Sequence, residues 1–244
     1  MKTAFKIILL TSIVGYLLFA VISLSRKNDD YVCNGVDIVI HGNNGNSLIK
    51  KEFVSDILAS QHISPQGQTI SNIDINRIKK IICKNAYIDS VQCYFTPKHN
   101  LCISVVPRKP VMHVITNDTE YYVDANGHAM PAGNFNLDLC LFTGNINKKL
   151  AKDKLLPLAL FINNNKPWDT EIQQVNVIDE KHIELIPLTG EHHIRIGEAK
   201  DIEEKMKKYL VFTKEGLDKA GWNKYDFIDL SFKGQVVCTK KDIN

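Results

Sequence analysis

The sequence lacks the short motifs that mark the common classes of enzyme. There is no Gly-x-Ser-x-Gly nucleophile turn, no His-Glu-x-x-His zinc helix and no glycine-rich phosphate loop. The six cysteines include no Cys-x-x-Cys pair, so the usual zinc-ribbon and thioredoxin-like patterns are absent as well. These absences predict a protein that is not an enzyme, with no catalytic residues, no cofactor and no metal site.

Excess charge of one sign is also missing. The chain has 30 Lys and Arg residues against 27 Asp and Glu residues, a formal net charge of +3, and no basic block with interleaved aromatics. This balance predicts no nucleic-acid partner. The sequence shows no repeats, and its length exceeds the usual size of one domain, so we expect two folded domains.

A few titratable residues are close enough in sequence to be considered as metal ligands or acid pairs. Adjacent residues of a strand point to opposite faces, so His192 and His193 would not both reach one ion, and a solvated hairpin is expected there. Asp124 and Asp179 lie in turn-like sequence, where an aspartate commonly bonds its own backbone. The group considered for a metal was His182, Glu191, His192 and His193.

The cysteines are scattered through apolar sequence. Their even number permits disulfides in a translocated domain, but the spacing selects no pairing. We expect most of them to be small buried thiols. Cys93 and Cys102 fall on opposite faces of two neighbouring strands, which argues against a disulfide between them.

One long hydrophobic run stands at the start of the chain. Residues 7–24 contain no charge, and as a helix they would reach ~27 Å, close to the ~30 Å core of a bilayer. We therefore expect one transmembrane helix, a charged linker at 26–30, a cytoplasmic N-terminus and a body outside the cytoplasm. The alternative is a cleaved signal peptide, because Lys2 and Lys6 form a basic start, although the run exceeds the usual length of such a peptide.

Residues 31–110 predict a small α+β domain with the order strand, helix, helix, strand, strand. Pro107-Arg-Lys-Pro110 then forms a stiff extended connection, since a proline stands at each end. The expected division is 1–30 for the tail, membrane helix and linker, 31–110 for the first domain, and 111–244 for a β domain. The elements expected in the first domain are a strand at 36–40, a helix capped by Ser47, a helix at 74–84, and strands at 91–95 and 101–106.

The β domain is expected to be rich in strands, with helices over 152–162 and 201–213. The run 226–239 is read as one long last strand, with Gly234 at a bulge. Because no chain follows to cover it, we expect it at the edge of the sheet, where unpaired backbone groups accept a strand of another protein. A strand paired on both sides is the alternative. Further strands are expected at 111–115, 120–124, 138–144, 172–177, 182–186 and 193–196.

Several local motifs follow one another in an order that is typical of one family. The motifs are Asn85-Ala-Tyr-Ile-Asp-Ser-Val91, Ile103-Ser-Val-Val-Pro-Arg-Lys-Pro-Val111, Tyr122-Val-Asp-x-x-Gly-x-x-x-Pro131, Phe142-Thr-Gly144, Trp168-x-x-x-Ile172 and Tyr225-x-x-Ile-Asp-Leu-x-Phe232 followed by Gly234-Gln-Val-Val237. On these motifs the chain resembles the bacterial cell-division family FtsQ, called DivIB in other lineages, and its first domain resembles a POTRA domain. Pro107 is a departure, since the family usually has an acidic residue there.

The resemblance implies a non-enzymatic scaffold of the divisome in the inner membrane at the division septum. Its expected partners are the coiled-coil division proteins FtsB (DivIC) and FtsL, together with other divisome members reached through the POTRA domain. In this family the partner adds a strand at the end of the β domain, in support of septal peptidoglycan synthesis. Carried over to this sequence, the partner-binding residues are Phe232, Gln235, Val236, Val237, Cys238 and Thr239.

Two other functions stay open. POTRA domains also occur in envelope and outer-membrane assembly factors, but there a barrel of many strands follows, for which the chain after residue 110 is too short. A membrane-anchored hydrolase with dispersed catalytic residues would instead have a deep polar pocket with converging titratable groups.

Overall fold

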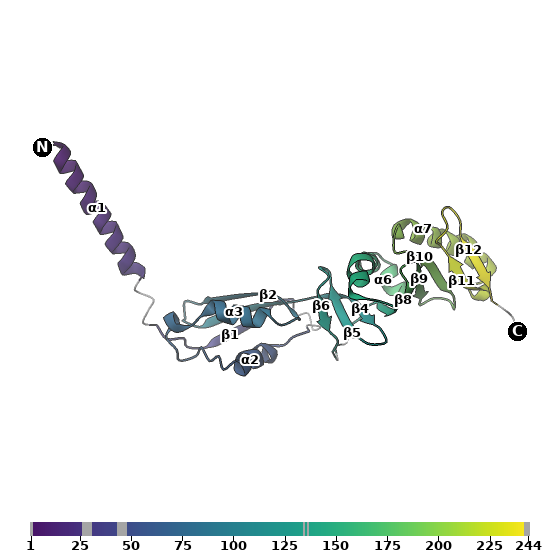
Figure 1. Cartoon of the computed structure of the whole chain (residues 1–244), viewed down its shortest axis with the longest axis horizontal. Coiled ribbons are helices and arrows are strands. Elements are labelled where there is room, and N and C mark those ends of the chain that lie inside the picture. Colours follow the sequence, from purple (N-terminus) through teal and green to yellow (C-terminus); the bar gives the residue numbers. More distant parts are fainter. Residues whose placement is uncertain (1, 26–30, 43–47, 134, 136, 242–244) are drawn as a thin grey trace. The chain divides into compact units, whose positions relative to one another are not determined.

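The computed structural model describes residues 2–25, 31–42, 48–133, 135 and 137–241 (Figure 1). Contacts between residues divide the chain into two compact units, Met1–Pro107 and Arg108–Asn244. The linker predicted at 26–30 and the helix cap predicted at Ser47 lie outside the described residues.

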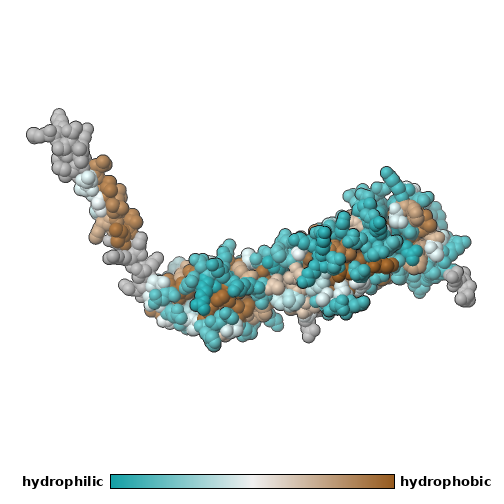
Figure 2. Space-filling view, viewed as in Figure 1, coloured by the Kyte–Doolittle hydropathy of each residue, from teal (hydrophilic) through white to brown (hydrophobic). Residues whose placement is uncertain are grey.

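Helix α1 (Lys2–Ser25) covers the hydrophobic run that opens the chain. Between Leu10 and Ile22 its large apolar side chains are exposed, and Figure 2 shows them as a brown band along the helix. Among the residues that the structure describes, no helix is both long and apolar enough to cross a membrane. The helix itself is therefore confirmed, and the transmembrane span predicted over 7–24 is not confirmed.

The first unit contains the predicted order of strands and helices. Its sheet has the order β1-β3-β2, with β1 parallel and β2 antiparallel to the central β3. The fold class is thus α+β, as expected. The elements are β1 (Val36–Ile40), α2 (Lys51–Ser60), η2 (Ile70–Asn72), α3 (Ile75–Cys83), β2 (Ile88–Phe95) and β3 (Leu101–Pro107).

The second helix of this unit follows directly from its sequence. The Asp74 carboxylate accepts a hydrogen bond from the Arg77 backbone amide at 2.9 Å, which satisfies one free donor at the start of α3. Ile78 and Ile82 lie four residues apart and are buried, so one stripe of the helix faces the sheet.

All six cysteines are free thiols, and three of them are fully buried, so the expectation that most are buried holds for only half. Cys93 pairs in register with Ile103, whereas Cys102 pairs with Tyr94, so the two thiols point to opposite faces. Burial raises the pKa of Cys140 to about 12 and is the main reason that the pKa of Cys93 rises to about 11. These thiols are protonated at neutral pH.

The second unit is built on a nine-stranded sheet in the order β12-β11-β10-β9-β8-β7-β4-β5-β6. Three neighbouring pairs are parallel: β4 with β7, β7 with β8, and β10 with β11. The strands are β4 (Pro110–Ile115), β5 (Glu120–Asp124), β6 (Ala129–Pro131), β7 (Leu141–Gly144), β8 (Ile172–Asp179), β9 (His182–Pro187), β10 (His193–Gly197), β11 (Tyr225–Asp229) and β12 (Val237–Lys240).

Helices of this unit connect two of the parallel pairs, β7 with β8 and β10 with β11. The helix predicted over 152–162 lies within a continuous helical stretch from Lys148 to Asn164, in which a π-helical turn joins α4 to α5 and Pro157 stands in the first turn of α5. The helices are α4 (Lys148–Leu150), η3 (Ala151–Leu155), α5 (Leu156–Asn164), α6 (Trp168–Glu171), α7 (Ile202–Phe212), η4 (Thr213–Leu217), α8 (Asp218–Ala220) and η5 (Trp222–Lys224).

One face of the sheet packs against α5 and α7. Phe142, Val175 and Ile194 are fully buried in the same cluster as Leu158 and Met206 of these helices. Side chains alternate along a strand, so Thr143 and Arg195, for example, lie on the opposite face.

The prediction of one long last strand is wrong. The segment forms a hairpin, in which β11 and β12 pair antiparallel across a connection at 230–236. Asp229 accepts hydrogen bonds from the amide and hydroxyl of Ser231, and Gly234 has a φ of 73° within the connection. Both features are turn chemistry, which breaks a strand that the hydrophobic pattern alone would continue.

The core makes a direct prediction for stability. Phe142→Ala should lower the free energy of unfolding of the second unit by about 3–5 kcal/mol, because it leaves a cavity at a fully buried site. Both tryptophans, Trp168 and Trp222, lie in this unit, so urea unfolding followed by their fluorescence measures it selectively. The exposed Phe232→Ala serves as the control and should change stability by less than about 1 kcal/mol. Equal effects of the two changes would contradict the assigned core.

Candidate functional site

The end of the sheet formed by the C-terminal hairpin is the candidate site. In the register of the hairpin, Val237 pairs with Asp229, Cys238 with Ile228 and Thr239 with Phe227. Within the part of the chain that the structure describes, no strand pairs with the other side of β12. The outer backbone groups of β12 are therefore open to a strand from another protein.

Side chains of this edge alternate between the two faces of the sheet. Val236 and Cys238 are half-buried and pack against the hydrophobic core, and burial raises the pKa of the Cys238 thiol. Val237 and Thr239 point the other way and are exposed, Val237 with 43% of its surface accessible. A strand placed beside β12 would thus meet both faces.

The remaining two predicted site residues lie in the connection before β12. Phe232 is exposed over 47% of its surface, which is unusual for a phenylalanine, and Gln235 is exposed as well. The structure therefore brings all six predicted residues together at one end of the sheet. Their role in binding a partner stays a prediction.

A groove runs along the core side of this edge. Its volume is about 570 Å³, and its apolar lining comes from Val211, Phe212 and Gly216 near the end of α7 and from Val236 before β12. Charged side chains surround the rim, namely Glu204, Lys207, Lys208 and Glu215. Val211 is 63% exposed, so apolar surface is left uncovered beside the edge strand.

A second hollow, of about 470 Å³, lies on the opposite, open face across β8 to β11. Two of its charged groups pair with each other: Arg195 Nε donates to Glu184 Oε1 at 3.0 Å, and the guanidinium stacks 3.5 Å above the Phe227 ring. Asp229, which also lines the hollow, is bonded to Ser231. Groups held in this way suit non-covalent recognition better than acid–base chemistry.

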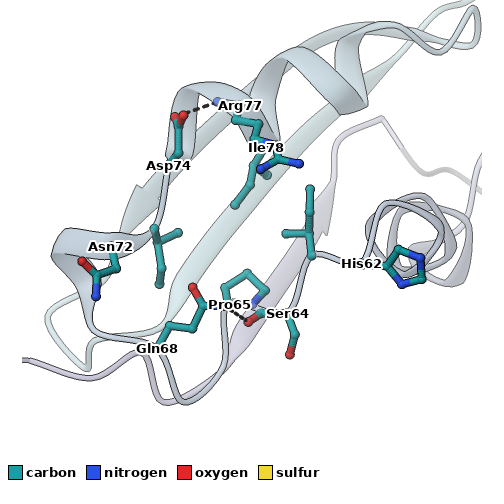
Figure 3. Close-up of a pocket in the computed structure, with 10 residues that line it drawn as sticks. His62, Ser64, Pro65, Gln68, Asn72, Asp74, Arg77 and Ile78 are labelled. Atoms are coloured by element: carbon teal, nitrogen blue, oxygen red, sulfur yellow. Dashed lines mark hydrogen bonds between the residues drawn. The ribbon is translucent and has the colours of Figure 1, made fainter.

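The first unit has a smaller hollow of about 160 Å³ (Figure 3). It lies between the 62–68 segment and the start of α3, with Ile73 and Ile78 buried beneath it. Figure 3 shows Asp74 turned to the Arg77 amide and Gln68 turned to the Ser64 carbonyl, to which it donates at 2.8 Å.

The histidine group is not the solvated hairpin that the sequence predicts. His192 is only 1% exposed, and its Nε2 lies 2.8 Å from the Tyr209 hydroxyl, while its Nδ1 is buried without a hydrogen-bond partner. His182 instead bonds Asp179 at the surface, and His193 lies near Glu184 on the open face. No cluster of three potential ligands that could hold a metal occurs among the described residues.

The two aspartates considered as an acid pair serve turns, as predicted. Asp124 is 4% exposed and accepts from the backbone of Asn126 and His128 and from the Arg108 guanidinium at 2.8 Å. Burial by itself would raise the pKa of Asp124, but these hydrogen bonds outweigh it and hold the pKa below its usual range. Asp179 likewise accepts from the amides of Lys181 and His182.

Sequence reasoning missed two buried polar residues of the second unit. His192 and Lys205 each sit in polar sequence that reads as exposed, and their partners lie on other elements. The sequence does show that His192 and His193 face opposite ways. It does not show which of the two faces the core.

Two family models match the chain. One, described as FtsQ/DivIB, C-terminal related, matches residues 109–239, which is just over half of the sequence. The other, described as a POTRA-like domain, matches residues 31–106. No curated protein matches the sequence significantly.

His192 predicts a pH dependence of stability. Burial, followed by the nearby charges of His193 and Lys241, lowers its pKa from 6.5 to about 4 in the folded state. The unfolded chain therefore binds a proton below pH 6.5 that the folded chain does not bind until about pH 4. The free energy of unfolding is therefore highest above pH 6.5, where His192 is neutral in both states. It decreases as the pH falls from 6.5 toward 4.

The free energy of unfolding can be measured with urea from pH 7 to pH 4.5. Its decrease over this range should be smaller by about 2 kcal/mol in His192→Gln than in the wild type. The exposed His182→Gln is the control and should change the slope far less, because its pair with Asp179 is exposed to solvent. Parallel curves for the wild type and His192→Gln would contradict the prediction.

Proposed function

Because the chain belongs to the FtsQ/DivIB family, we propose that it is a division-associated scaffold that holds other division proteins together. The POTRA-like domain before the family region supports this, since the two together form the architecture of such scaffolds. The single observation that carries the proposal at the level of residues is the unpaired edge of β12.

In this proposal a partner segment adds a strand to β12. Its backbone would bond to the outer N–H and C=O groups of Val237, Cys238 and Thr239, which supplies affinity with little dependence on sequence. Val237 and Thr239 would contact its side chains on the open face, together with Phe232 at the near end.

The core side of the edge would supply selectivity. Side chains of an added strand alternate, so every second one would point toward the groove beside Val236. An apolar residue there would cover Val211 and Phe212, and Gln235 would border it at the connection. We propose FtsB/DivIC-like and FtsL-like coiled-coil proteins as the partners, in support of septal peptidoglycan synthesis.

The POTRA-like unit would contact other divisome members and help to localise the chain to the division septum. Membrane association is part of the same proposal. It is supported by the exposed apolar side chains of α1 between Leu10 and Ile22, which need a non-aqueous environment. The single-pass arrangement with a cytoplasmic N-terminus and an extracytoplasmic body stays a prediction.

The families matched here are known as non-catalytic scaffolds, and we propose no enzymatic activity. A hydrolase would need titratable groups that are free to react. In the hollow of the open face, Glu184 is instead paired with Arg195, and Asp229 is bonded to Ser231. An envelope-assembly role is kept as an outcome of the experiment below.

Photo-crosslinking in living cells tests the proposal. A photoreactive residue at Val237, and separately at Val236, should capture a small single-pass coiled-coil protein, because both positions lie along the docked strand. The matched control is Glu203, an exposed residue on the outer side of α7 in the same unit, which should capture nothing of this size.

Capture of an outer-membrane barrel protein at Val237 would instead indicate a function in envelope assembly. No capture at either edge position, with the full-length protein present at normal levels, would mean that β12 is covered and that the proposed site is wrong.

A further inference from the structure

Two lysines of α7 reach across to the ends of two neighbouring strands. Lys205 Nζ donates to the carbonyls of Ile196 and Glu198 at 2.7 and 2.8 Å. Lys208 Nζ donates to the carbonyls of Leu230 and Phe232 at 2.9 and 2.7 Å. Each ammonium thus bridges two carbonyls that are two residues apart.

The two sets of carbonyls are equivalent positions in the sheet. β10 and β11 run parallel, and Arg195 pairs with Asp229 in their register. Ile196 and Leu230 are the next residues on the two strands, and Glu198 and Phe232 follow two positions later. Two lysines from one turn of α7 therefore bind the carbonyls at both strand ends, one lysine at each.

Lys208 contacts the chain where β11 ends and the connection to β12 begins. The carbonyls it binds lie on either side of Ser231, which itself donates to Asp229. Leu230 is fully buried, so its carbonyl has no ready access to water if the ammonium is removed. The chain from Asp229 to Phe232 is thus fixed from two sides, before it turns through Gly234 to β12.

We propose that Lys208 is a positioning residue for the partner-binding edge. By fixing the end of β11, it determines how the connection leaves the sheet, keeps Phe232 exposed and aligns β12 for an added strand. This inference rests on the proposed function for its consequence in binding, while its effect on the hairpin is a property of the free protein.

The chain offers a matched control at the adjacent residue. Lys207 carries the same charge on the same helix, but it is exposed and pairs with Glu203 four residues earlier at 2.8 Å. Such a pair contributes little to stability. Lys207→Met and Lys208→Met remove the same charge and keep a similar aliphatic length, so a difference in hydrogen exchange between them reports the carbonyl contacts of Lys208.

The test is amide hydrogen exchange of residues 230–240 in the full-length protein, combined with photo-crosslinking from Val237 in cells. In Lys208→Met these amides should exchange about tenfold faster, and capture should fall several-fold. Lys207→Met should match the wild type in hydrogen exchange. For capture the control is Lys200→Met, because Lys200 is exposed and lies outside the groove that Lys207 borders, and it should match the wild type. Lys208→Arg should restore both, because it retains the donors.

Tryptophan fluorescence establishes that each variant is folded at the temperature of the measurements. If Lys208→Met is not, Lys208→Gln replaces it, since its shorter amide does not span both carbonyls, and the same pattern is expected. Unchanged exchange in the folded variant would overturn the inference. Faster exchange with undiminished capture would likewise overturn it.

A different result bears on the proposed function. If the wild type itself gives no capture at Val237, then the edge is not the binding site. The proposed role of Lys208 in partner binding is then wrong as well. Unchanged exchange with normal wild-type capture would leave the proposed function standing and remove only the role of Lys208.

Discussion

The parallel pairing of β10 with β11 is the constraint on which the end of the molecule depends. Two neighbouring parallel strands cannot be joined by a tight turn, so the chain must cross over one face of the sheet. Here α7 and the short helices after it make that crossover and cover the core with Met206 and Tyr209. Among the described residues, β12 then pairs with the far side of β11 and forms the edge of the sheet.

The same helix therefore has two tasks. Its apolar stripe packs against the core. Its lysines Lys205 and Lys208 bind carbonyls at the ends of β10 and β11, where the chain continues toward the last hairpin. A protein that recognises partners through backbone groups needs such support, because a strand that shifts by one residue turns every side chain to the other face.

Much of this architecture can be predicted from the sequence. The apolar stripes of α3 and α7 repeat at helical spacing, so the helices predicted at 74–84 and 201–213 agree with the structure within one residue at each end. The edge position expected for the end of the run 226–239 holds for β12 among the described strands. The turn inside the run 226–239 was missed because strand-like residues flank it on both sides. Its geometry depends on Lys208, more than twenty residues earlier.

The sequence also did not predict which polar residues are buried. His192 and Lys205 are fixed by the Tyr209 hydroxyl and by the carbonyls of Ile196 and Glu198. Each of these partners lies on a different element, so no local pattern reveals that a polar residue is buried. Alternation fixes that His192 and His193 face opposite ways, and only the packing of α7 decides which of them is enclosed.

The ion pair between Arg108 and Asp124 has a mechanical consequence. Arg108 is the first residue of the second unit, and Asp124 stands at the end of β5, opposite Pro110. A pull on the chain at Pro107 is therefore not carried by β4 alone. Part of the load passes through the guanidinium to Asp124 and, through its bonds to Asn126 and His128, into the β5–β6 turn. Tension at this junction is spread over two strands and a turn before any pair of the sheet has to break.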